Sequence, residues 1–289
     1  MNTPVLTPPL AHWLAGARQT AQQPPRQPRQ PLVVAGQVVG SVADGFLSQI
    51  SLQRLMDKRY QLLNSEHAGV AAWHLDVTAD TAPVAHSSSN LSVITDALNT
   101  LAEALRDEGL SGPWRNEQLA VTNPNGQVVG TVERGAVRVL GIASRAVHLV
   151  GLAPNGCMWV QKRALTKPNN PGQWDTLMGG MVSAADSLPQ ALARETWEEA
   201  GLQVDALADV EHGGHVLFSR PSSEGGGAGY MVERIDWFRA QVPDGMEPCN
   251  QDGEVDEFAL RSTEEVREQL VQGRFTLEAG LVIAAHWGL

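Results

Sequence analysis

The stretch "GMVSAADSLPQALARETWEEAGL", residues 180–202, decides the fold of this chain. Ser187 can cap a helix, and Pro189 is tolerated in the first turn that follows it. Gly201 supplies the left-handed residue that commonly closes a helix. These signals together predict a helix over about residues 188–200.

This helix carries a dense cluster of carboxylates. Glu195, Glu198 and Glu199 follow one another at steps of three and four, which place them within an arc of about 100° on one face. Arg194 is the only basic residue close to them in sequence. Each like-charged pair costs roughly a few tenths of a kcal/mol, so a purely structural helix would alternate Glu with Lys. The sequence therefore predicts that a positive partner from elsewhere binds here.

The other face of the helix is expected to pack on the rest of the domain, while the carboxylate face points away from it and collects oxygen ligands. Hard divalent cations such as Mg²⁺ bind carboxylate oxygens, retain waters and commonly bridge to substrate phosphates. Such a cation would remove the repulsion among the glutamates. The residues expected on the packing face are Ala193, Thr196, Trp197 and Ala200.

The spacing of this stretch resembles the motif of the Nudix hydrolases. That motif reads Gly, five residues, Glu, seven residues, Arg-Glu-aliphatic-any-Glu-Glu-any-Gly-aliphatic, and residues 180–202 match its spacing throughout. Asp186 stands where the motif has its first Glu and keeps the charge on a shorter arm. Thr196 stands where the motif has an aliphatic residue, and its β-branched side chain can still pack.

The resemblance implies a metal site and a catalytic role for this helix. It implies that Glu195, Glu198 and Glu199 are catalytic and hold Mg²⁺, with Mn²⁺ as an alternative ion. Arg194 is implied to orient a glutamate, and the Gly179 carbonyl to be a further metal ligand. The pair of glycines at 179 and 180 would permit a close backbone approach to the metal, which a side chain would obstruct.

Other segments resemble a narrower group, the Nudix proteins related to thiamine pyrophosphokinase. They read "WRNEQLAV", "ERGAVRVLGI", "HLVGL", "WVQKRALTKPNNPGQWDTLMGGM", "NQDGEV" and "LVIAAHWGL". That group carries an extra N-terminal α/β domain and includes hydrolases of oxidised thiamine diphosphate analogues. The resemblance implies an α/β (α+β) protein, with a Nudix α/β/α sandwich and mixed sheet over residues 131–289 and a smaller α/β domain over residues 1–130.

Length and composition are consistent with a globular two-domain enzyme. The chain has 289 residues, 43% of them hydrophobic, and no run of about 18 uncharged apolar residues that could span a membrane. A formal net charge of -11 argues against nucleic acid as a partner, because nucleic-acid binding depends on clustered Lys and Arg. The first residues lack the pattern of an export signal, which predicts a cytoplasmic location. A homodimer is compatible with these features.

Pro and Gly residues mark the expected boundaries of other elements. Residues 23–31, "QPPRQPRQP", are expected to form an extended linker or loop, and the following "LVVAGQVVGSVAD" to form a strand. Leucines and isoleucine at helical spacing predict a helix over residues 91–108, with Ser89 or Asn90 as its cap. The glycine-rich residues 220–230 are expected to form a mobile hairpin tip.

Two further hairpins and a helix are expected in the second half of the chain. Asn-Gly turns predict hairpins about residues 123–126 and 154–156. A helix is expected over about residues 263–272, with Ser262 as a plausible cap. His148 is expected to pack at a strand, with a role in ligand binding as the alternative.

Basic residues just before the motif are candidates for binding a diphosphate. Arg163 is the first candidate, because arginine makes forked pairs with phosphate, and Lys167 and Lys162 are the others. The alternative is that they form a solvated strand end. Attack by water on phosphorus also needs a base, and Glu254 follows the turn dipeptide Asp252-Gly253 at the entrance of a strand. Either of the acids Asp252 and Glu257 could take this role instead.

These observations predict a Mg²⁺-dependent hydrolase of the diphosphate linkage in a small organic diphosphate. The narrower resemblance indicates thiamine diphosphate or its oxidised analogues as substrates. One alternative is an isomerase like isopentenyl diphosphate isomerase, but neither Cys157 nor Cys249 has the histidine-rich surroundings which that family implies. The other alternative is a non-catalytic ligand sensor, and the three clustered glutamates argue against it.

Overall fold

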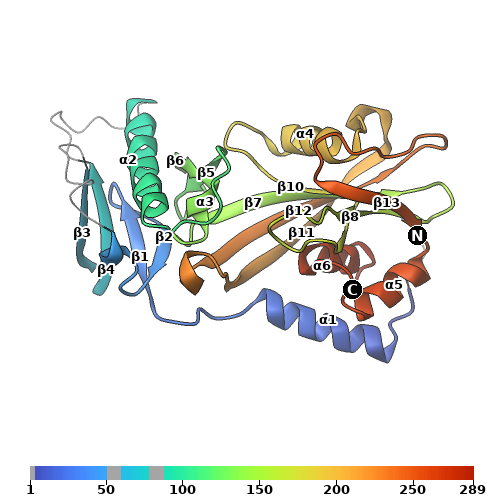
Figure 1. Cartoon of the computed structure of the whole chain (residues 1–289), viewed down its shortest axis with the longest axis horizontal. Coiled ribbons are helices and arrows are strands. Elements are labelled where there is room, and N and C mark those ends of the chain that lie inside the picture. The colour runs from blue at the N-terminus through green and yellow to red at the C-terminus, as the bar shows by residue number, and fades with distance from the viewer. Residues whose placement is uncertain (1–3, 51–59, 78–87) are drawn as a thin grey trace.

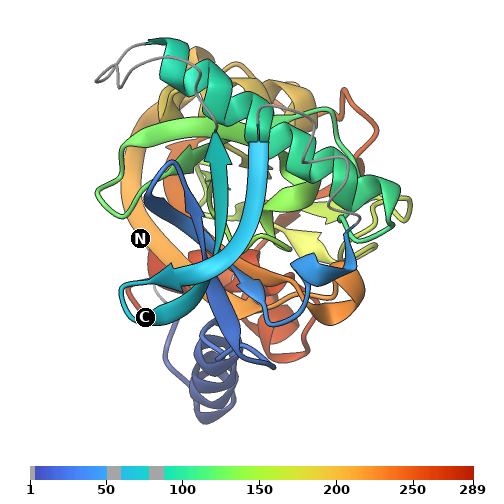
Figure 2. The ribbon, with the colours of Figure 1, turned by 90° about the vertical axis from the view of Figure 1, so that its left-hand side faces the viewer.

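The computed structural model describes residues 4–50, 60–77 and 88–289, which form a mixed α/β protein with two sheets of four and seven strands and a separate two-stranded hairpin (Figure 1). The four-stranded sheet lies at one end of the molecule, and Figure 2 views the molecule from that end. Within the described residues, no helix is long and apolar enough to cross a membrane.

The N-terminal sheet has the strand order β2-β1-β4-β3. A tight turn at Ala35 and Gly36, both with positive φ, joins β1 to β2, so the segment expected to be one strand is a hairpin. The strand β1 begins at Arg29, inside the proline-rich segment expected to be a loop. Its parallel pairing with β4 starts only at Leu32, so Pro31 needs no N–H there. The strands are β1 (Arg29–Val34), β2 (Gln37–Ala43), β3 (Tyr60–His67) and β4 (Val70–Val77).

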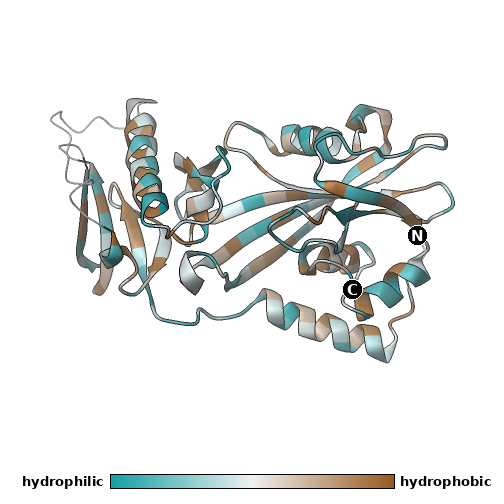
Figure 3. Ribbon diagram, viewed as in Figure 1, coloured by the Kyte–Doolittle hydropathy of each residue, from teal (hydrophilic) through white to brown (hydrophobic). Residues whose placement is uncertain are grey.

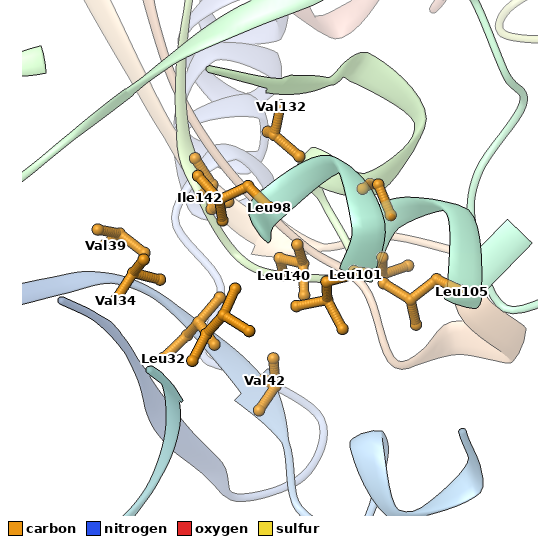
Figure 4. Packing of buried hydrophobic residues seen from close by; sticks show 14 of the residues in the cluster. Leu32, Val34, Val39, Val42, Leu98, Leu101, Leu105, Val132, Leu140 and Ile142 are labelled. Carbon is orange, nitrogen blue, oxygen red and sulfur yellow. The ribbon is translucent and has the colours of Figure 1, made fainter. Parts of the chain in front are cut away.

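The helix α2 (Ser88–Asp107) packs between this sheet and the hairpin of β5 (Gln118–Thr122) and β6 (Val128–Glu133). It begins at Ser88, so both residues expected to cap it lie inside it. Hydrophobic and hydrophilic residues alternate along α2 (Figure 3), as expected for a helix with one apolar face. Figure 4 shows that face packing against the first strands and against the segment after β6; the labelled residues include Leu32, Val42, Leu98, Leu101, Leu105, Leu140 and Ile142.

The C-terminal sheet has the order β11-β12-β7-β8-β13, with β10 paired to β7 and β9 to β8. The strand β12 runs parallel to β7, and the other pairs are antiparallel, so the sheet is mixed as expected. The strands are β7 (Ala143–Leu152), β8 (Met158–Arg163), β9 (Trp174–Asp175), β10 (Met178–Met181), β11 (Ala208–Pro221), β12 (Tyr230–Gln241) and β13 (Val255–Arg261).

Helices cover both faces of this sheet. Side chains alternate along β7, so Val147 and Leu149 pack towards α4 (Leu188–Ala200), whereas Ala146 and Val150 pack in the cluster with α6 (Leu277–His286). The helix α5 (Thr263–Val271) lies on the same side as α6, with Ser262 capping it as expected. The expected hairpin turn at residues 154–156 joins β7 to β8. This arrangement is the expected α/β/α sandwich.

The helix α1 (Pro8–Ala21) lies with the C-terminal sheet and not with the N-terminal one. It contacts α5, α6 and β11, because Leu14, Ala17 and Ala21 are buried in the same cluster as α6. The core of the N-terminal sheet, in turn, continues through Ile142. A boundary at residue 130 therefore does not separate the two cores. The helix α1 lies before this boundary but packs with the C-terminal sheet, and Ile142 lies after it but packs with the N-terminal sheet.

The loop between β11 and β12 packs against the N-terminal part of the protein. It forms the expected hairpin connection, but its tip is not isolated: a Cβ at Gly225 would touch Val139, Phe46 and the Leu110 carbonyl. Glu224 in this loop pairs with Arg138 at 3.2 Å. The loop therefore joins the two parts of the protein.

Asp236 ties three strands together, and its loss is expected to destabilise the fold. Its buried carboxylate accepts hydrogen bonds from Arg145, Arg234 and His212. Burial alone would raise the pKa of Asp236, but the hydrogen bonds and charges of Arg234 and Arg145 lower it to about 2. Asp236→Asn is expected to cost about 2 kcal/mol of unfolding free energy at pH 7, measured by urea denaturation.

The same residue predicts a pH dependence of stability. Because the folded-state pKa of Asp236 lies below the unfolded value of about 4, its contribution is present above pH 4 and is lost as the pH falls towards 2. The stability difference between wild type and Asp236→Asn should therefore shrink over that window. Asp256→Asn, at an exposed position on β13, is the matched control. An unchanged difference at pH 2.5 would contradict the assignment.

Candidate active site

The carboxylate-bearing helix has the predicted boundaries, Leu188–Ala200. Ser187 and Gln190 form a capping box at its start, and Gly201 ends it with a φ of 63°. Gly201 also lies against the Cys249 carbonyl, where a side chain would collide. These local interactions fix the rotation and the length of α4, and so fix where its glutamates lie.

The faces of α4 differ in part from the expectation. Thr196 and Ala200 are buried as expected, but Ala193 and Trp197 are exposed, Trp197 by 47%. Glu195 and Glu199 are only 9% and 2% exposed and face the sheet. The reason lies in β10, where glycines at 179 and 180 leave space over the strand. A Cβ at Gly180 would collide with the Glu195 carboxylate. Gly180 therefore makes room for the Glu195 carboxylate, and Gly179 for the His148 ring. The close approach of this backbone to a metal stays a prediction.

Arg194 connects the acids at the edge of the helix. Its guanidinium donates to Glu195 at 2.8 Å and to Glu198 at 3.1 Å. It also pairs with Asp186 at 2.8 Å, so the shorter acid in the motif still reaches its partner. A fourth hydrogen bond goes to the Met181 carbonyl. These contacts hold the carboxylates of the motif in fixed positions.

Glu199 lies deepest in the site. Its Oε2 accepts hydrogen bonds from the Gln161 amide at 2.7 Å and from the Gly179 backbone N–H at 2.9 Å, and the Lys167 Nζ lies 4.0 Å from its Oε1. Burial raises the pKa of Glu199, although Lys167 opposes the shift. Burial also raises the pKa of Glu195 to about 7, with Glu199 and Glu198 adding to the effect and Arg194 opposing it.

These acids face a cavity of about 350 Å³, here called the acid cavity. Its walls include the three glutamates and both glycines together with the basic residues that follow β8. Glu254 and Asp252 also line it, from the loop before β13. Its main polar lining residues are Arg163, Lys167, Arg194, Glu195, Glu198, Glu199, Asp252 and Glu254.

Two of the residues considered outside the motif lie elsewhere. Lys162 points to the other side of β8 from Arg163, as alternation along a strand requires, and its Nζ lies 3.8 Å from Glu257. Neither of the two lines the acid cavity. Lys167, by contrast, pairs with Glu254 inside it. The structure thus brings Arg163, Lys167 and Glu254 to the glutamates.

The donor chemistry of the acid cavity suits a hard divalent cation. Three carboxylates of α4 converge on it, and the burial that raises two of their pKa values would be offset by a bound positive charge. In the described part of the chain, no group of three or more His, Cys, Asp or Glu side chains is arranged as a ready metal cage. Arg194 and Lys167 take the ion-pairing positions instead.

A second cavity of about 310 Å³ adjoins the acid cavity and was not predicted from the sequence. The two share Arg134, Arg163, Asn169, Gly179, Gly180 and Met181. This inner cavity, as we call it, is polar: its charged lining residues are Arg134, Arg138, Arg163, Asp175, Arg220, Glu224, Glu233 and Glu278. They come from segments spread over nearly the whole second half of the chain, with no spacing that could have indicated them.

His148 lies in the wall of the inner cavity. It is 5% exposed, its Nδ1 lies 2.9 Å from the Thr176 hydroxyl and its ring fills the space above Gly179. Burial lowers the pKa of His148, although Asp175 opposes the shift. The expectation that His148 packs at a strand is confirmed, and the residue also lines a cavity.

The part of the chain before β7 contributes to both cavities. Arg115, Glu117 and Arg134 line the acid cavity, and Arg134 pairs with Glu117 at 2.7 Å. Arg138 lines the inner cavity. These residues lie in and beside α3 (Arg134–Val137), which follows β6 directly.

Comparison with known proteins finds a similarity in the second half of the chain. Residues 143–279 match the family model described as NUDIX domain. The chain is 28% identical over 177 residues to "Nudix hydrolase 24, chloroplastic" and 30% identical over 172 residues to "Nudix hydrolase 20, chloroplastic", both from Arabidopsis thaliana. Each match covers 57% of this chain, but only 46% and 44% of the plant proteins, so the chain spans less than half of their length.

A solved structure, DR0079 from Deinococcus radiodurans, aligns with 59% of this chain and 98% of its own length. Its sequence identity is 20% and its TM-score 0.46.

Proposed function

We propose that this chain, whose residues 143–279 form a Nudix domain, is a metal-dependent enzyme that hydrolyses the diphosphate linkage of a small organic diphosphate. One observation carries the proposal: three glutamates of α4 and the cations Arg163 and Lys167 line one cavity. Diphosphates are commonly bound by a divalent cation together with Arg or Lys donors. The acid cavity offers both.

Mg²⁺, or Mn²⁺ in its place, would be held by Glu195, Glu198 and Glu199, with the Gly179 carbonyl as a further ligand. When bound there, the cation supplies Lewis-acid polarisation of the phosphoryl oxygens. Arg194 holds Glu195 and Glu198 in place through its hydrogen bonds. Gln161 and the Gly179 N–H do the same for Glu199.

The basic residues of the cavity would bind the diphosphate itself. Arg163 donates to Asp175 at 3.3 Å and to the Asn169 carbonyl, which fixes its guanidinium at the point where the two cavities meet. Lys167 offers a point charge between Glu199 and Glu254. Glu254 is the acid outside α4 best placed to accept the proton of the attacking water.

Thiamine diphosphate and its oxidised analogues are the substrates that we place first. The support is the sequence resemblance outside the motif and a polar second cavity next to the acid cavity. The isomerase alternative is disfavoured, because Cys157 and Cys249 line neither cavity. A ligand sensor without catalysis would not need the three glutamates of α4 that line the acid cavity.

The direct test is phosphate or monophosphate release from a panel of diphosphates, measured with Mg²⁺, with Mn²⁺ and with a chelator. The panel should contain thiamine diphosphate, oxidised analogues, nucleoside diphosphate derivatives and isopentenyl diphosphate. We expect metal-dependent hydrolysis of at least one member. Isomerisation of isopentenyl diphosphate, or binding without turnover across the panel, would contradict the proposal.

Arg134 is expected to contribute to substrate binding from outside the Nudix domain. It lines both cavities, so it can reach a ligand that extends from one to the other. Arg134→Gln is expected to raise KM by about 10-fold with little change in kcat, since the lost charge acts equally on bound substrate and transition state. Steady-state kinetics on the best substrate of the panel would measure it.

Arg106→Gln is the control for this variant, because Arg106 lies on α2 over the Trp114 ring and lines neither cavity. Unchanged KM in Arg134→Gln would show that the segment before β7 plays no part in substrate binding.

A further inference from the structure

Glu233 is a buried carboxylate for which the proposed catalysis has no use. It lies on β12, in the parallel pairing with β7, where its Cα partner is Ser144. The residue is 6% exposed and lines the inner cavity. It is not part of the motif and lies far from it in sequence.

Only one oxygen of this carboxylate has a partner. The Ser144 hydroxyl donates to Oε2 at 3.0 Å, and no described residue donates a hydrogen bond to Oε1. Oε1 is not fully enclosed by protein atoms, so a molecule in the cavity can reach it. A ligand N–H that enters the cavity at this point would therefore meet an acceptor that has no donor from the protein.

Arg138 supplies a donor in the same cavity. Its Nη1 donates to Glu224 at 3.2 Å, and the remaining N–H groups have no acceptor among the described residues. Burial lowers the pKa of Arg138, but the carboxylates of Glu233, Glu224 and Glu278 outweigh it and raise the pKa overall. The guanidinium therefore stays charged. Glu233 and Arg138 both line the inner cavity, so an acceptor and a donor are available to whatever fills it.

We propose that Glu233 and Arg138 recognise the non-phosphate end of the substrate, and that this end is an amino-substituted nitrogen heterocycle. In such a ring an amino N–H donor stands next to a ring nitrogen that accepts, which complements a cavity wall that offers both a carboxylate and a guanidinium. The cavity of about 310 Å³ has room for one ring system, and its charged walls disfavour an apolar chain. This inference rests on the proposed function only for the position of the diphosphate.

The test compares diphosphates that differ only in an amino or an oxo group on the ring: ADP with IDP, CDP with UDP, and thiamine diphosphate with oxythiamine diphosphate. The oxo form inverts the pattern, because its exocyclic atom accepts and its ring nitrogen donates. Dissociation constants are measured by calorimetry in metal-free buffer, and hydrolysis is measured separately with Mg²⁺. The wild type is expected to bind the amino member of at least one pair about 10-fold more tightly. The pair that shows the preference identifies the ring.

Glu233→Gln is the decisive variant. The Gln oxygen can still accept from Ser144, which turns its NH₂ group towards the cavity, so a donor replaces the acceptor. The preference for the amino member is expected to disappear or reverse. Glu211→Gln, on the neighbouring strand β11 and exposed, is the matched control and should keep the wild-type preference. Thermal unfolding confirms that both variants are folded.

The outcomes separate this inference from the proposed function. Equal affinity within every pair, no binding at all, or an unchanged preference in folded Glu233→Gln would overturn the inference. Hydrolysis without any amino preference would uphold the proposed function and overturn the inference. An amino preference that Glu233→Gln abolishes, with no hydrolysis of any diphosphate, would uphold the inference and overturn the proposed function.

Discussion

Replacing Glu199 by Gln is expected to lower turnover by more than about 100-fold while leaving the protein folded. Residues that only support a metal ligand cost 10- to 100-fold when they are changed, so a direct ligand should cost at least as much. Glu199 is enclosed, and Gln161 and the Gly179 N–H fix its carboxylate. Gln has the same shape and keeps one oxygen for these donors, so the packing of α4 on β10 should survive.

Three measurements check this expectation. Product release on the best diphosphate gives turnover, calorimetry gives Mg²⁺ affinity, and circular dichroism gives the folded state. Both turnover and Mg²⁺ affinity should fall. Glu268→Gln, at an exposed position on α5, controls for the loss of one acidic charge and should be neutral. A folded Glu198→Gln/Glu199→Gln double variant that retained activity would remove the metal assignment altogether.

Local sequence signals were sufficient to predict the helix that carries the site. Ser187, Pro189 and Gly201 act within one turn of the helix ends, and the helix has the predicted limits. The hairpins after Thr122 and Leu152 were predictable for the same reason, because Asn-Gly and related turns determine their own geometry. The resemblance to the Nudix motif added the chemistry of the glutamates.

The buried face of that helix was harder to predict, since it depends on a strand outside it. The expectation placed Trp197 inside and the glutamates outside, because apolar side chains usually pack. Gly180 on β10 reverses this for Glu195, because the absence of a side chain there leaves space for the carboxylate. The glycines at 179 and 180 were interpreted as room for a metal, but in the structure Gly180 makes room for Glu195 and Gly179 for His148.

Features that depend on distant contacts could not be predicted. The position of α1 follows from Leu14 and Ala17 meeting α6, more than 250 residues later in the chain. The inner cavity likewise combines Arg138, Glu233 and Glu278, which share no spacing or motif. Such residues can be recognised as one site only from the folded structure, in which segments distant in the sequence lie together.

Glu254→Gln is expected to reduce turnover by on the order of 10²-fold with little change in KM, the usual effect of losing a general base. Glu254 lines the acid cavity, and its backbone is held there: its N–H donates to Asp252 at 2.8 Å and its carbonyl accepts from the Ala164 N–H at 2.9 Å. Gly253, with a φ of 82°, makes the turn that presents it.

The pairing of Glu254 with Lys167 defines when this acid can act as a base. As long as Lys167 binds its carboxylate, Glu254 is held in an ion pair and is not free to accept a proton from water. Phosphate oxygens entering the cavity compete for the same ammonium, which burial already makes less basic by lowering its pKa. Substrate binding is therefore expected to draw Lys167 away and leave Glu254 free beside the phosphorus, so that the base forms only when a diphosphate is present.

Two acids of the same segment serve as comparisons for Glu254→Gln. Asp252→Asn changes the other acid of this loop that lines the cavity, and its effect should be smaller because its carboxylate accepts from the Glu254 N–H. Glu257→Gln, on β13 and paired with Lys162 outside the cavity, should have near-normal turnover. If Glu254→Gln retained wild-type turnover while Asp252→Asn lost it, the base would be Asp252. If neither variant lost activity, the proton would have to be accepted by a glutamate of α4, and fewer than three of those would then be free to hold metal.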